Sequence, residues 1–535
     1  MIRAVLASLA LLVAAPTAHA SELPMQLPGD VTASSVRADP DTWLIGAALS
    51  KRTAKIARRF GAEHFGLDGT GTYVVARSRA RAFAKALGRG LVFAEPNALR
   101  EVAAAGPADP LSTPGDWRAK VAGDLTPPPV VPDSPLIALI DAAVDLTHEE
   151  FRGNPNISVL GGGTVTSPHG TATAAVAAAP QNGVGIVGVW PGARVLNVPL
   201  AVQNTPAGGT ISCKASGDGI ERAVEAGAAV INMSYGSRSR CASEWVQIYF
   251  AVAKGIIPVA AAGNEFADGN PLEFPASLPH VVTVAATTPD DSSAWFSNVN
   301  DAIDLAAPGE GILTAVPKHL DTTGQDGYEA LDGTSFAAPM VSAAMAWVRA
   351  ARPDLKPDQV IQAVRLTARD VLQPGWDRLT GFGILNVGAA LAVNKKRLPP
   401  ADPLEPNDNL AWVNGTLLPR AEPVWSGSGI KRVNATLDKQ EDKVDVYRIV
   451  IPPRRSARIS VIPRFGDPAL DVFPATAFAV NRLRERVGSS HRRGSKRTER
   501  LTIVNPDSTS RTYYVAVTPQ GKSRYQEREY TLRVA

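Results

Sequence analysis

Short, almost unbroken apolar runs alternate with helical stretches through the middle of the chain, from residue 106 to residue 396. Between the runs, apolar residues recur with helical spacing, for example at 219–226 and 241–253. Strands that are apolar at nearly every position are typical of a parallel sheet that helices cover on both faces. The pattern therefore predicts a doubly wound α/β domain, with strands at 136–140, 195–198, 229–233, 256–262 and 281–285.

Two smaller units are predicted on either side of this domain. Residues 21–105 mix both periodicities and predict a small α+β unit, with helices at 51–60 and 79–87 and strands at 42–45, 73–75 and 91–93. After a proline-rich linker at 397–404, apolar and polar residues alternate, which is typical of antiparallel strands. Residues 405–535 are therefore predicted to form an antiparallel β-sandwich, with strands at 444–451, 457–462, 501–504, 513–517 and 530–534.

Residues 1–20 have the layout of a secretory signal peptide, with basic Arg3, an apolar run at 4–15 and small residues near position 20. The run is too short to cross a bilayer, and Arg3 argues against the alternative of a buried helix. We therefore expect an exported protein, either periplasmic or extracellular. Cys213 and Cys241 fit this compartment, because an even number of cysteines in an exported chain favours a disulfide over two free thiols.

Charge is spread unevenly over the 535 residues, which carry 55 Lys and Arg against 51 Asp and Glu. From Leu398 onward there are 23 basic and 15 acidic residues, and before it there are 32 and 36. The most basic segment is 482–500, with eight basic and two acidic residues. Two interpretations remain: a surface that binds an anionic polymer or the cell envelope, or a solvated hairpin loop. Aromatic residues do not alternate with these charges, so nucleic acid is not an expected partner.

Four residues with chemically useful side chains stand at predicted strand ends and helix starts. Asp141 follows an apolar strand, and His169 opens an alanine-rich helix. Asn264 follows another strand, and Ser335 lies at the start of a long helix. Each residue alone has an ordinary explanation as a turn residue or helix cap. Together they supply an acid, an imidazole, an amide donor and a hydroxyl, which are the groups used in nucleophilic acyl transfer.

The segments around these residues resemble the subtilisin family of serine peptidases. The matching blocks are ALID at 138–141, HGT at 169–171, AGN at 262–264 and GTSFAAP at 333–339. One block matches only in part, because Thr171-Ala172-Thr173 stands where many relatives have a second histidine. The resemblance implies a subtilisin-like fold and a catalytic triad of Asp141, His169 and Ser335, with the Asn264 side chain in the oxyanion hole and no cofactor needed for the chemistry.

The resemblance also implies roles for the rest of the chain. The unit at 21–105 is similar to an inhibitory propeptide, and the tail that contains Glu405-Pro406-Asn407-Asp408 is similar to the C-terminal β-sandwich of secreted bacterial peptidases. Ser234, Tyr235 and Gly236 would pair with the backbone of a protein or peptide substrate as an added strand. A monomer is expected, with its own propeptide as inhibitor.

Two further expectations follow from family positions. Structural calcium is expected near Glu150 and Asn182, whose oxygen atoms suit a hard cation, although Asn-Gly is also an ordinary turn. Glu273 precedes Phe274-Pro275-Ala276 and is expected at the base of the pocket for the side chain before the cleaved bond, where it would favour Lys or Arg. The alternative is that the preceding loop turns Glu273 into solvent.

The leading hypothesis is therefore a secreted serine endopeptidase that works through an acyl-enzyme. One alternative is a catalytically idle, subtilisin-shaped protein that binds surfaces through its basic tail. Another is an esterase with the same triad, which the missing GxSxG motif disfavours.

Overall fold

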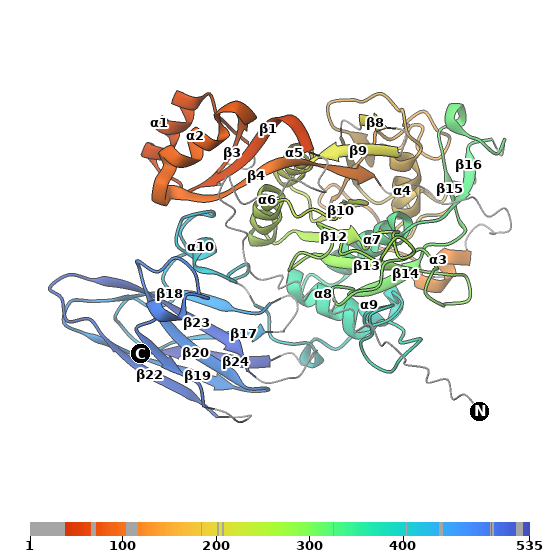
Figure 1. The fold of residues 1–535 in the computed structure, drawn as a ribbon. Helices are drawn as coiled ribbons and strands as arrows, with labels where there is room; N and C mark the ends of the chain where they lie inside the picture. Colours follow the sequence, from red (N-terminus) through yellow and green to blue (C-terminus); the bar gives the residue numbers. More distant parts are fainter. Residues whose placement is uncertain are drawn as a thin grey trace, which may run out of the picture.

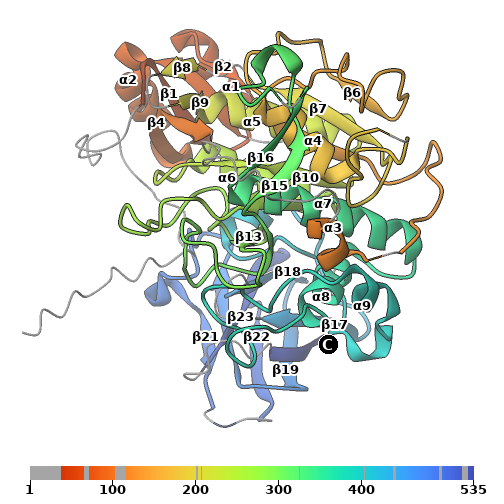
Figure 2. The same cartoon turned by 90° about the vertical axis from the view of Figure 1, so that its right-hand side faces the viewer.

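The computed structural model describes residues 38–65, 71–102, 116–123, 125–182, 184–200, 203–205, 208–324, 326–402, 404–437, 442–492, 494, 497–520 and 528–535. The signal peptide predicted at 1–20 lies outside these ranges. A small α+β unit, a central unit with a parallel sheet and a β-rich unit follow one another along the chain (Figures 1 and 2). No helix in the described ranges is long and apolar enough to span a membrane.

The central unit is built on a sheet of seven parallel strands, which confirms the predicted doubly wound α/β fold. The five strands expected from the apolar runs all belong to it, and two short edge strands complete it. Across the sheet the order is β14 (Leu305–Pro308), β13 (Val282–Thr287), β12 (Ile257–Ala261), β10 (Val230–Met233), β5 (Ile137–Asp141), β7 (Val195–Pro199) and β6 (Ile157–Val159).

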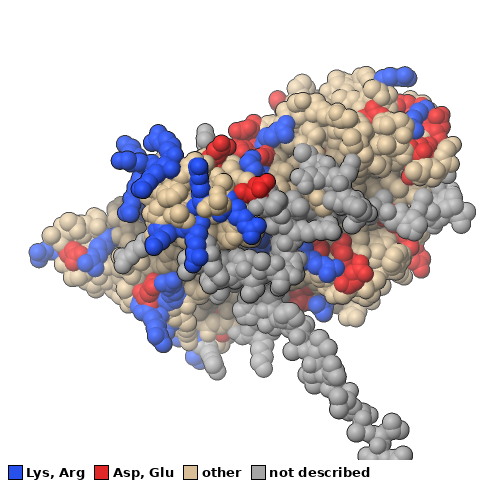
Figure 3. Space-filling model, turned by 45° about the horizontal axis from the view of Figure 1, so that its top comes forward, with Lys and Arg blue, Asp and Glu red and all other residues tan. Residues whose placement is uncertain are grey.

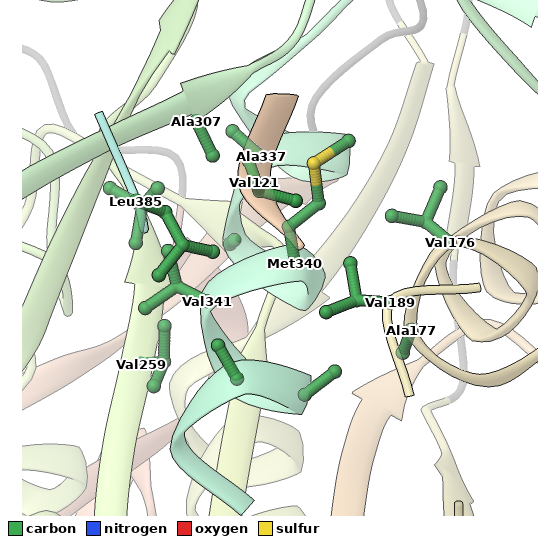
Figure 4. Packing of buried hydrophobic residues seen from close by; sticks show 14 of the residues in the cluster. Val121, Val176, Ala177, Val189, Val259, Ala307, Ala337, Met340, Val341 and Leu385 are labelled. Atoms are coloured by element: carbon green, nitrogen blue, oxygen red, sulfur yellow. The ribbon is translucent and has the colours of Figure 1, made fainter. Parts of the chain in front are cut away.

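Helices cover both faces of this sheet, as the apolar strands require. Ile137 and Leu139 of β5 belong to the core that contains α4 (His169–Ala178) and α7 (Thr334–Ala351). Ala138 and Ile140 belong to the core formed with α5 (Cys213–Glu225) and α6 (Ala242–Ala253). Helix α7 is buried along most of its length, and Figure 4 shows Met340 and Val341 packed beside Val189, Val259 and Leu385.

The remaining elements of the central unit lie around this core. The disulfide between Cys213 and Cys241 joins the first residue of α5 to the residue before α6, with 6.0 Å between the Cα atoms. The other elements are α3 (Asp116–Val121), β15 (Ile312–Ala315), β16 (Tyr328–Leu331), α8 (Pro357–Leu366) and α9 (Val387–Ala392).

The N-terminal unit is an antiparallel sheet with two helices packed on it. Its elements are β1 (Ala38–Ala47), α1 (Lys51–Phe60), β2 (Glu63–His64), β3 (Thr72–Ala76), α2 (Arg77–Leu87) and β4 (Leu91–Val102). The far end of β4 leaves this unit and pairs with β9 (Gly208–Ser212) and β11 (Tyr235–Gly236) of the central unit; β9 also pairs with β8 (Gln203–Thr205). Figure 1 shows β4 extending past α5 toward β9.

Basic side chains gather over α1 and α2 (Figure 3). Both helices lack acidic residues, and their exposed basic residues are Lys51, Arg52, Lys55, Arg58, Arg59, Arg77, Arg79, Arg81 and Lys85. The sequence analysis placed the strongest positive charge in the tail and did not anticipate this second cationic surface.

The C-terminal unit is the predicted antiparallel β-sandwich (Figure 2). One sheet has the order β17 (Lys431–Leu437), β24 (Arg528–Val534), β19 (Ser456–Pro463) and β22 (Glu499–Val504). The other has the order β18 (Asp445–Ile451), β23 (Arg511–Pro519), β20 (Pro468–Pro474) and β21 (Gly488–Ser490). The short helix α10 (Leu410–Val413) precedes the sheets, and its Trp412 packs into the core of the central unit against Tyr249, with ring centroids 4.5 Å apart.

Candidate active site

Asp141 and His169 meet at the carboxyl edge of the parallel sheet. Asp141 is the last residue of β5 and His169 is the first residue of α4. His169 Nδ1 lies 2.7 Å from Asp141 Oδ1, and both side chains are buried. Gly170 allows this approach, because a Cβ at that position would overlap the carbonyl oxygen of Ala142. The imidazole is therefore held by its Nδ1 against a buried carboxylate.

Two further donors complete the environment of the Asp141 carboxylate. The Ala142 N–H donates to Oδ1 at 2.7 Å, and the Thr173 hydroxyl lies 3.1 Å from Oδ2. A buried carboxylate is costly unless donors satisfy it, so these contacts offset the cost of burying Asp141. Thr173 lies one helical turn after His169, in the block where the sequence departs from the family pattern. The sequence analysis did not assign it a role.

Ser335 lies beside this pair, near the start of α7. Its hydroxyl is 3.4 Å from the carbonyl oxygen of Ser234, and its side chain is 1% exposed. The rings of His169 and Phe336 have centroids 5.9 Å apart, so the imidazole lies over the first turn of α7. Among the described residues, His169 Nε2 has no hydrogen-bond partner. Nε2 is therefore without a protein partner and lies beside the start of α7, the helix that carries Ser335.

The Asn264 side chain has a fixed orientation. Its Oδ1 accepts hydrogen bonds from the backbone N–H and the hydroxyl of Thr334, each at 2.9 Å. Because a backbone N–H can only donate, the atom facing it must be the oxygen, which leaves Nδ2 as a donor on the other side. A Cβ on Gly333 would lie 3.4 Å from this Nδ2, so the donor lies beside the residue that precedes α7.

The segment Ser234-Tyr235-Gly236 lies next to Ser335 and forms one wall of the site. The Ser234 hydroxyl donates to the carbonyl oxygen of Ser335 at 2.9 Å and accepts from Asn232 Nδ2 at 2.9 Å. Tyr235 and Gly236 form β11, whose backbone pairs antiparallel with Val102 and Glu101 of β4. A chain segment therefore already lies along this wall as an added strand.

Two side chains just upstream on β4 cap helices of the central unit. The Glu95 carboxylate accepts from the N–H groups of Ala242 and Ser243 at the start of α6, at 2.6 and 2.9 Å. Asn97 Oδ1 accepts from the Lys214 N–H at the start of α5, at 2.9 Å. Helix N-termini have unsatisfied donors, so these contacts attach the N-terminal unit to the same two helices that the disulfide joins.

Glu273 is buried rather than turned into solvent, with 4% of its surface exposed. A Cβ on Gly236 would lie 2.9 Å from Glu273 Oε2, and a Cβ on Gly263 would lie 2.6 Å from Glu273 Cγ. The side chain therefore lies between the β11 wall and the residue before Asn264. A second carboxylate, Glu265, also borders Gly263, and burial raises its pKa. The sequence analysis did not single out Glu265.

Glu150 and Asn182 lie together, away from the triad. Glu150 Oε1 accepts from the Ile186 N–H at 2.6 Å and from the Tyr328 hydroxyl at 3.1 Å. Its Oε2 has no partner among the described residues, and burial raises the pKa of the carboxyl to about 7. Asn182 Oδ1 accepts from the Val184 N–H at 3.1 Å, and Nδ2 lies 3.5 Å from the Glu150 carbonyl oxygen. One carboxylate oxygen is therefore available to a cation here.

The chain is similar to known peptidases of one family. The sequence model of the Subtilase family matches residues 133–383. Fervidolysin from Fervidobacterium pennivorans is 32% identical over 285 residues, which cover 48% of this chain and 40% of fervidolysin. Subtilisin DY from Bacillus licheniformis is 32% identical over 259 residues, which cover 48% of this chain and 89% of subtilisin DY. The chain thus spans most of subtilisin DY but less than half of fervidolysin.

The crystal structure of fervidolysin, described as a keratinolytic enzyme related to subtilisin, aligns over a larger share of the chain. The TM-score is 0.57 at 19% identity, over 87% of this chain and 85% of that one. At this identity the match shows a common fold that extends beyond the central unit.

Proposed function

Because the chain belongs to the Subtilase family, we propose that it is a secreted serine endopeptidase whose catalytic residues are Asp141, His169 and Ser335. The observation that carries the proposal is the 2.7 Å contact from Asp141 to His169 Nδ1, which leaves Nε2 unoccupied beside the start of α7. Export follows from the predicted signal peptide and would make the disulfide stable.

In the proposed reaction, Ser335 Oγ attacks the carbonyl carbon of a peptide bond while His169 Nε2 takes its proton. The negative charge that develops on the carbonyl oxygen is stabilised by Asn264 Nδ2 and the Ser335 N–H. The imidazolium then gives its proton to the leaving nitrogen as the C–N bond breaks. Water hydrolyses the resulting ester by the same steps in reverse order. Asp141 holds the imidazole tautomer and stabilises its charged form.

The residues 21–105 are proposed to act as an inhibitory propeptide. The support is the pairing of β4 with β11, because a substrate would add to the same strand through its backbone. The Glu95 and Asn97 caps hold β4 in register with this wall. While β4 stays in place, a substrate cannot occupy the wall.

A preference for Lys or Arg before the cleaved bond is proposed for the same site. It is supported by the buried Glu273 side chain, which lies between β11 and Gly263, with the Glu265 carboxylate beside it. A cationic side chain entering between β11 and Gly263 would gain charge-assisted hydrogen bonds in a partly desolvated pocket. Structural calcium at Glu150 and Asn182 is proposed on the free carboxylate oxygen, and it takes no part in the chemistry.

Casein hydrolysis and short-chain ester hydrolysis by the matured protein test this proposal against the esterase alternative. An endopeptidase cleaves casein, and Ser335→Ala abolishes that cleavage. Ester hydrolysis without casein cleavage would favour an esterase. If the Ser335→Ala variant kept both activities, the assignment of Ser335 as the nucleophile would be contradicted.

A further inference from the structure

Four carboxylates form a buried cluster where the chain passes from the central unit into the β-sandwich, far from the triad in the sequence. Asp402 and Glu405 belong to the connecting segment, Asp442 precedes β18, and Asp445 is its first residue. One carboxylate oxygen of each residue lies within 4.8 Å of the others. Asp402, Asp442 and Asp445 are all at least nine-tenths buried, and Asp445 is completely buried.

The cluster has more acceptors than donors. One oxygen of Asp402 accepts from the Thr436 N–H at 3.0 Å, and one oxygen of Asp445 accepts from the Tyr530 hydroxyl. Oδ1 of Asp402, Asp442 and Asp445 has no hydrogen-bond partner among the described residues. No ion pair among those residues joins the cluster to a lysine or arginine; Glu405 alone has a basic neighbour, His280, at 3.3 Å.

Carboxylates packed this closely repel one another, and burial removes the water that would screen them. Burial and then mutual repulsion accordingly raise the pKa values of Asp402, Glu405 and Asp442 well above the ordinary range. Burial also raises the pKa of Asp445, to about 6. A divalent cation among the four oxygens would offset the repulsion and provide a partner for the carboxylate oxygens that have none.

We propose that Asp402, Glu405, Asp442 and Asp445 bind a calcium ion that fastens the connecting segment to the β-sandwich. Calcium prefers six to eight oxygen ligands in a flexible arrangement, which suits carboxylates from two separate chain segments. Magnesium usually keeps several waters and is bound by fewer carboxylates. The four ligands include no thiolate or imidazole, so a zinc site is disfavoured.

The ion would also support the position of the β-sandwich against the central unit. The Asp402 N–H donates to Asp358 Oδ2 at the start of α8, at 2.7 Å. The cluster borders a cavity of about 310 Å³ that is lined by residues of α8, β12 and the sandwich. Asp402 thus contacts both units through different atoms, and neutralising its carboxylate would secure this junction.

Calcium stoichiometry of the full chain tests the proposal. Ser335→Ala is used as the parent so that the chain does not digest itself; it is stripped with EDTA, dialysed, and titrated with calcium chloride in equilibrium dialysis. Asp445→Asn and Asp402→Asn should each lose one bound calcium per chain relative to the parent. Asp471→Asn should lose none, because Asp471 is a buried sandwich aspartate paired with Arg486 and His491 outside the cluster. Unchanged stoichiometry in both cluster variants would overturn the proposal.

Thermal melting gives a second test that does not depend on counting ions. In EDTA, Asp445→Asn relieves repulsion and should leave the Tm unchanged or raise it. In calcium, the same variant should melt below the parent. A higher Tm in both conditions would mean that the cluster holds protons instead of an ion.

A third measurement remains informative if the cluster variants fail to fold. Glu150→Gln in the same parent removes the other expected calcium site. This chain should still bind calcium and gain Tm from it, and magnesium chloride at the same concentration should have less effect. Absence of any calcium binding in Glu150→Gln would overturn the proposal.

Discussion

At the level of single residues, the Thr173 hydroxyl is the contact to Asp141 that the family motifs did not indicate. Thr173→Val keeps the shape of the side chain and removes one hydrogen bond to a buried carboxylate. Such bonds contribute about 1.5–3 kcal/mol, so we expect kcat to fall roughly tenfold or more. KM should stay the same, because the Thr173 side chain is fully buried and out of reach of a substrate.

Thr173→Ser is the matched control, since it keeps the hydroxyl. Steady-state kinetics on a small peptide substrate should show recovery of kcat in this variant. An equal loss in both variants would mean that the position matters for packing rather than for its hydrogen bond.

Glu273 is the residue that decides the proposed specificity. Glu273→Gln should lower kcat/KM for peptides with Lys or Arg before the cleaved bond by about 10- to 100-fold, because a charge-assisted contact is lost. Peptides with Leu at that position should be affected much less. Profiling a peptide library with both proteins measures this, with Glu329→Gln, a buried glutamate bonded to Thr322, as the control. If the wild-type enzyme preferred large apolar residues before the cleaved bond, the assignment of Glu273 would be contradicted.

The sequence indicated the proposed reacting residues but not the groups that contact them. Asp141, His169, Asn264 and Ser335 lie in short motifs, so their positions were readable without coordinates. Thr173 contacts Asp141 because α4 packs with one face toward β5, and Glu95 caps α6 because β4 runs past the start of that helix. These are consequences of tertiary packing, which local sequence patterns do not encode.

At the level of secondary structure, strand β4 links the N-terminal unit to the central unit. Release of β4 from β11 is the expected activating event. Ser335→Ala should accumulate as a precursor that begins at Ser21, because the chain could not cleave itself. The wild-type chain should begin between residues 99 and 111. N-terminal sequencing of both purified proteins measures this. Normal trimming of Ser335→Ala without an added peptidase would contradict self-cleavage.

Predictions of secondary structure were clearest for the central strands of the parallel sheet. The apolar runs of β5, β10 and β12 are buried at every position, so their pattern was unambiguous. Strand β17 buries only Ala435 and Leu437 and was not predicted. Strand β20 is buried but bounded by prolines at both ends, which is also typical of a loop.

At the level of the whole molecule, the tail is anchored to the central unit by more than its linker. Trp412, Leu417 and Leu418 belong to the same core as Trp245 and Tyr249 of α6. Deleting residues 398–535 should therefore expose these aromatic rings and lower the Tm, whereas deleting 422–535 should keep that contact. Thermal melting of both truncations, with activity on a small peptide, measures the difference. Equal Tm values would contradict a structural role for this contact.

Binding to anionic surfaces also depends on more than one unit of the molecule. The tail remains the predicted binding surface of the matured protein, but the basic side chains of α1 and α2 give the precursor a second one. Salt-dependent binding should therefore be compared only between forms that lack the N-terminal unit.

The central claim is that Ser335 is the nucleophile of an active endopeptidase. Mass spectrometry of the matured protein after treatment with a fluorophosphonate tests it most directly, because this reagent bonds to an activated serine hydroxyl. The account predicts one adduct per chain, mapped to Ser335, together with loss of casein hydrolysis, and no adduct in His169→Ala. An unlabelled Ser335, or full casein hydrolysis after complete labelling, would contradict it.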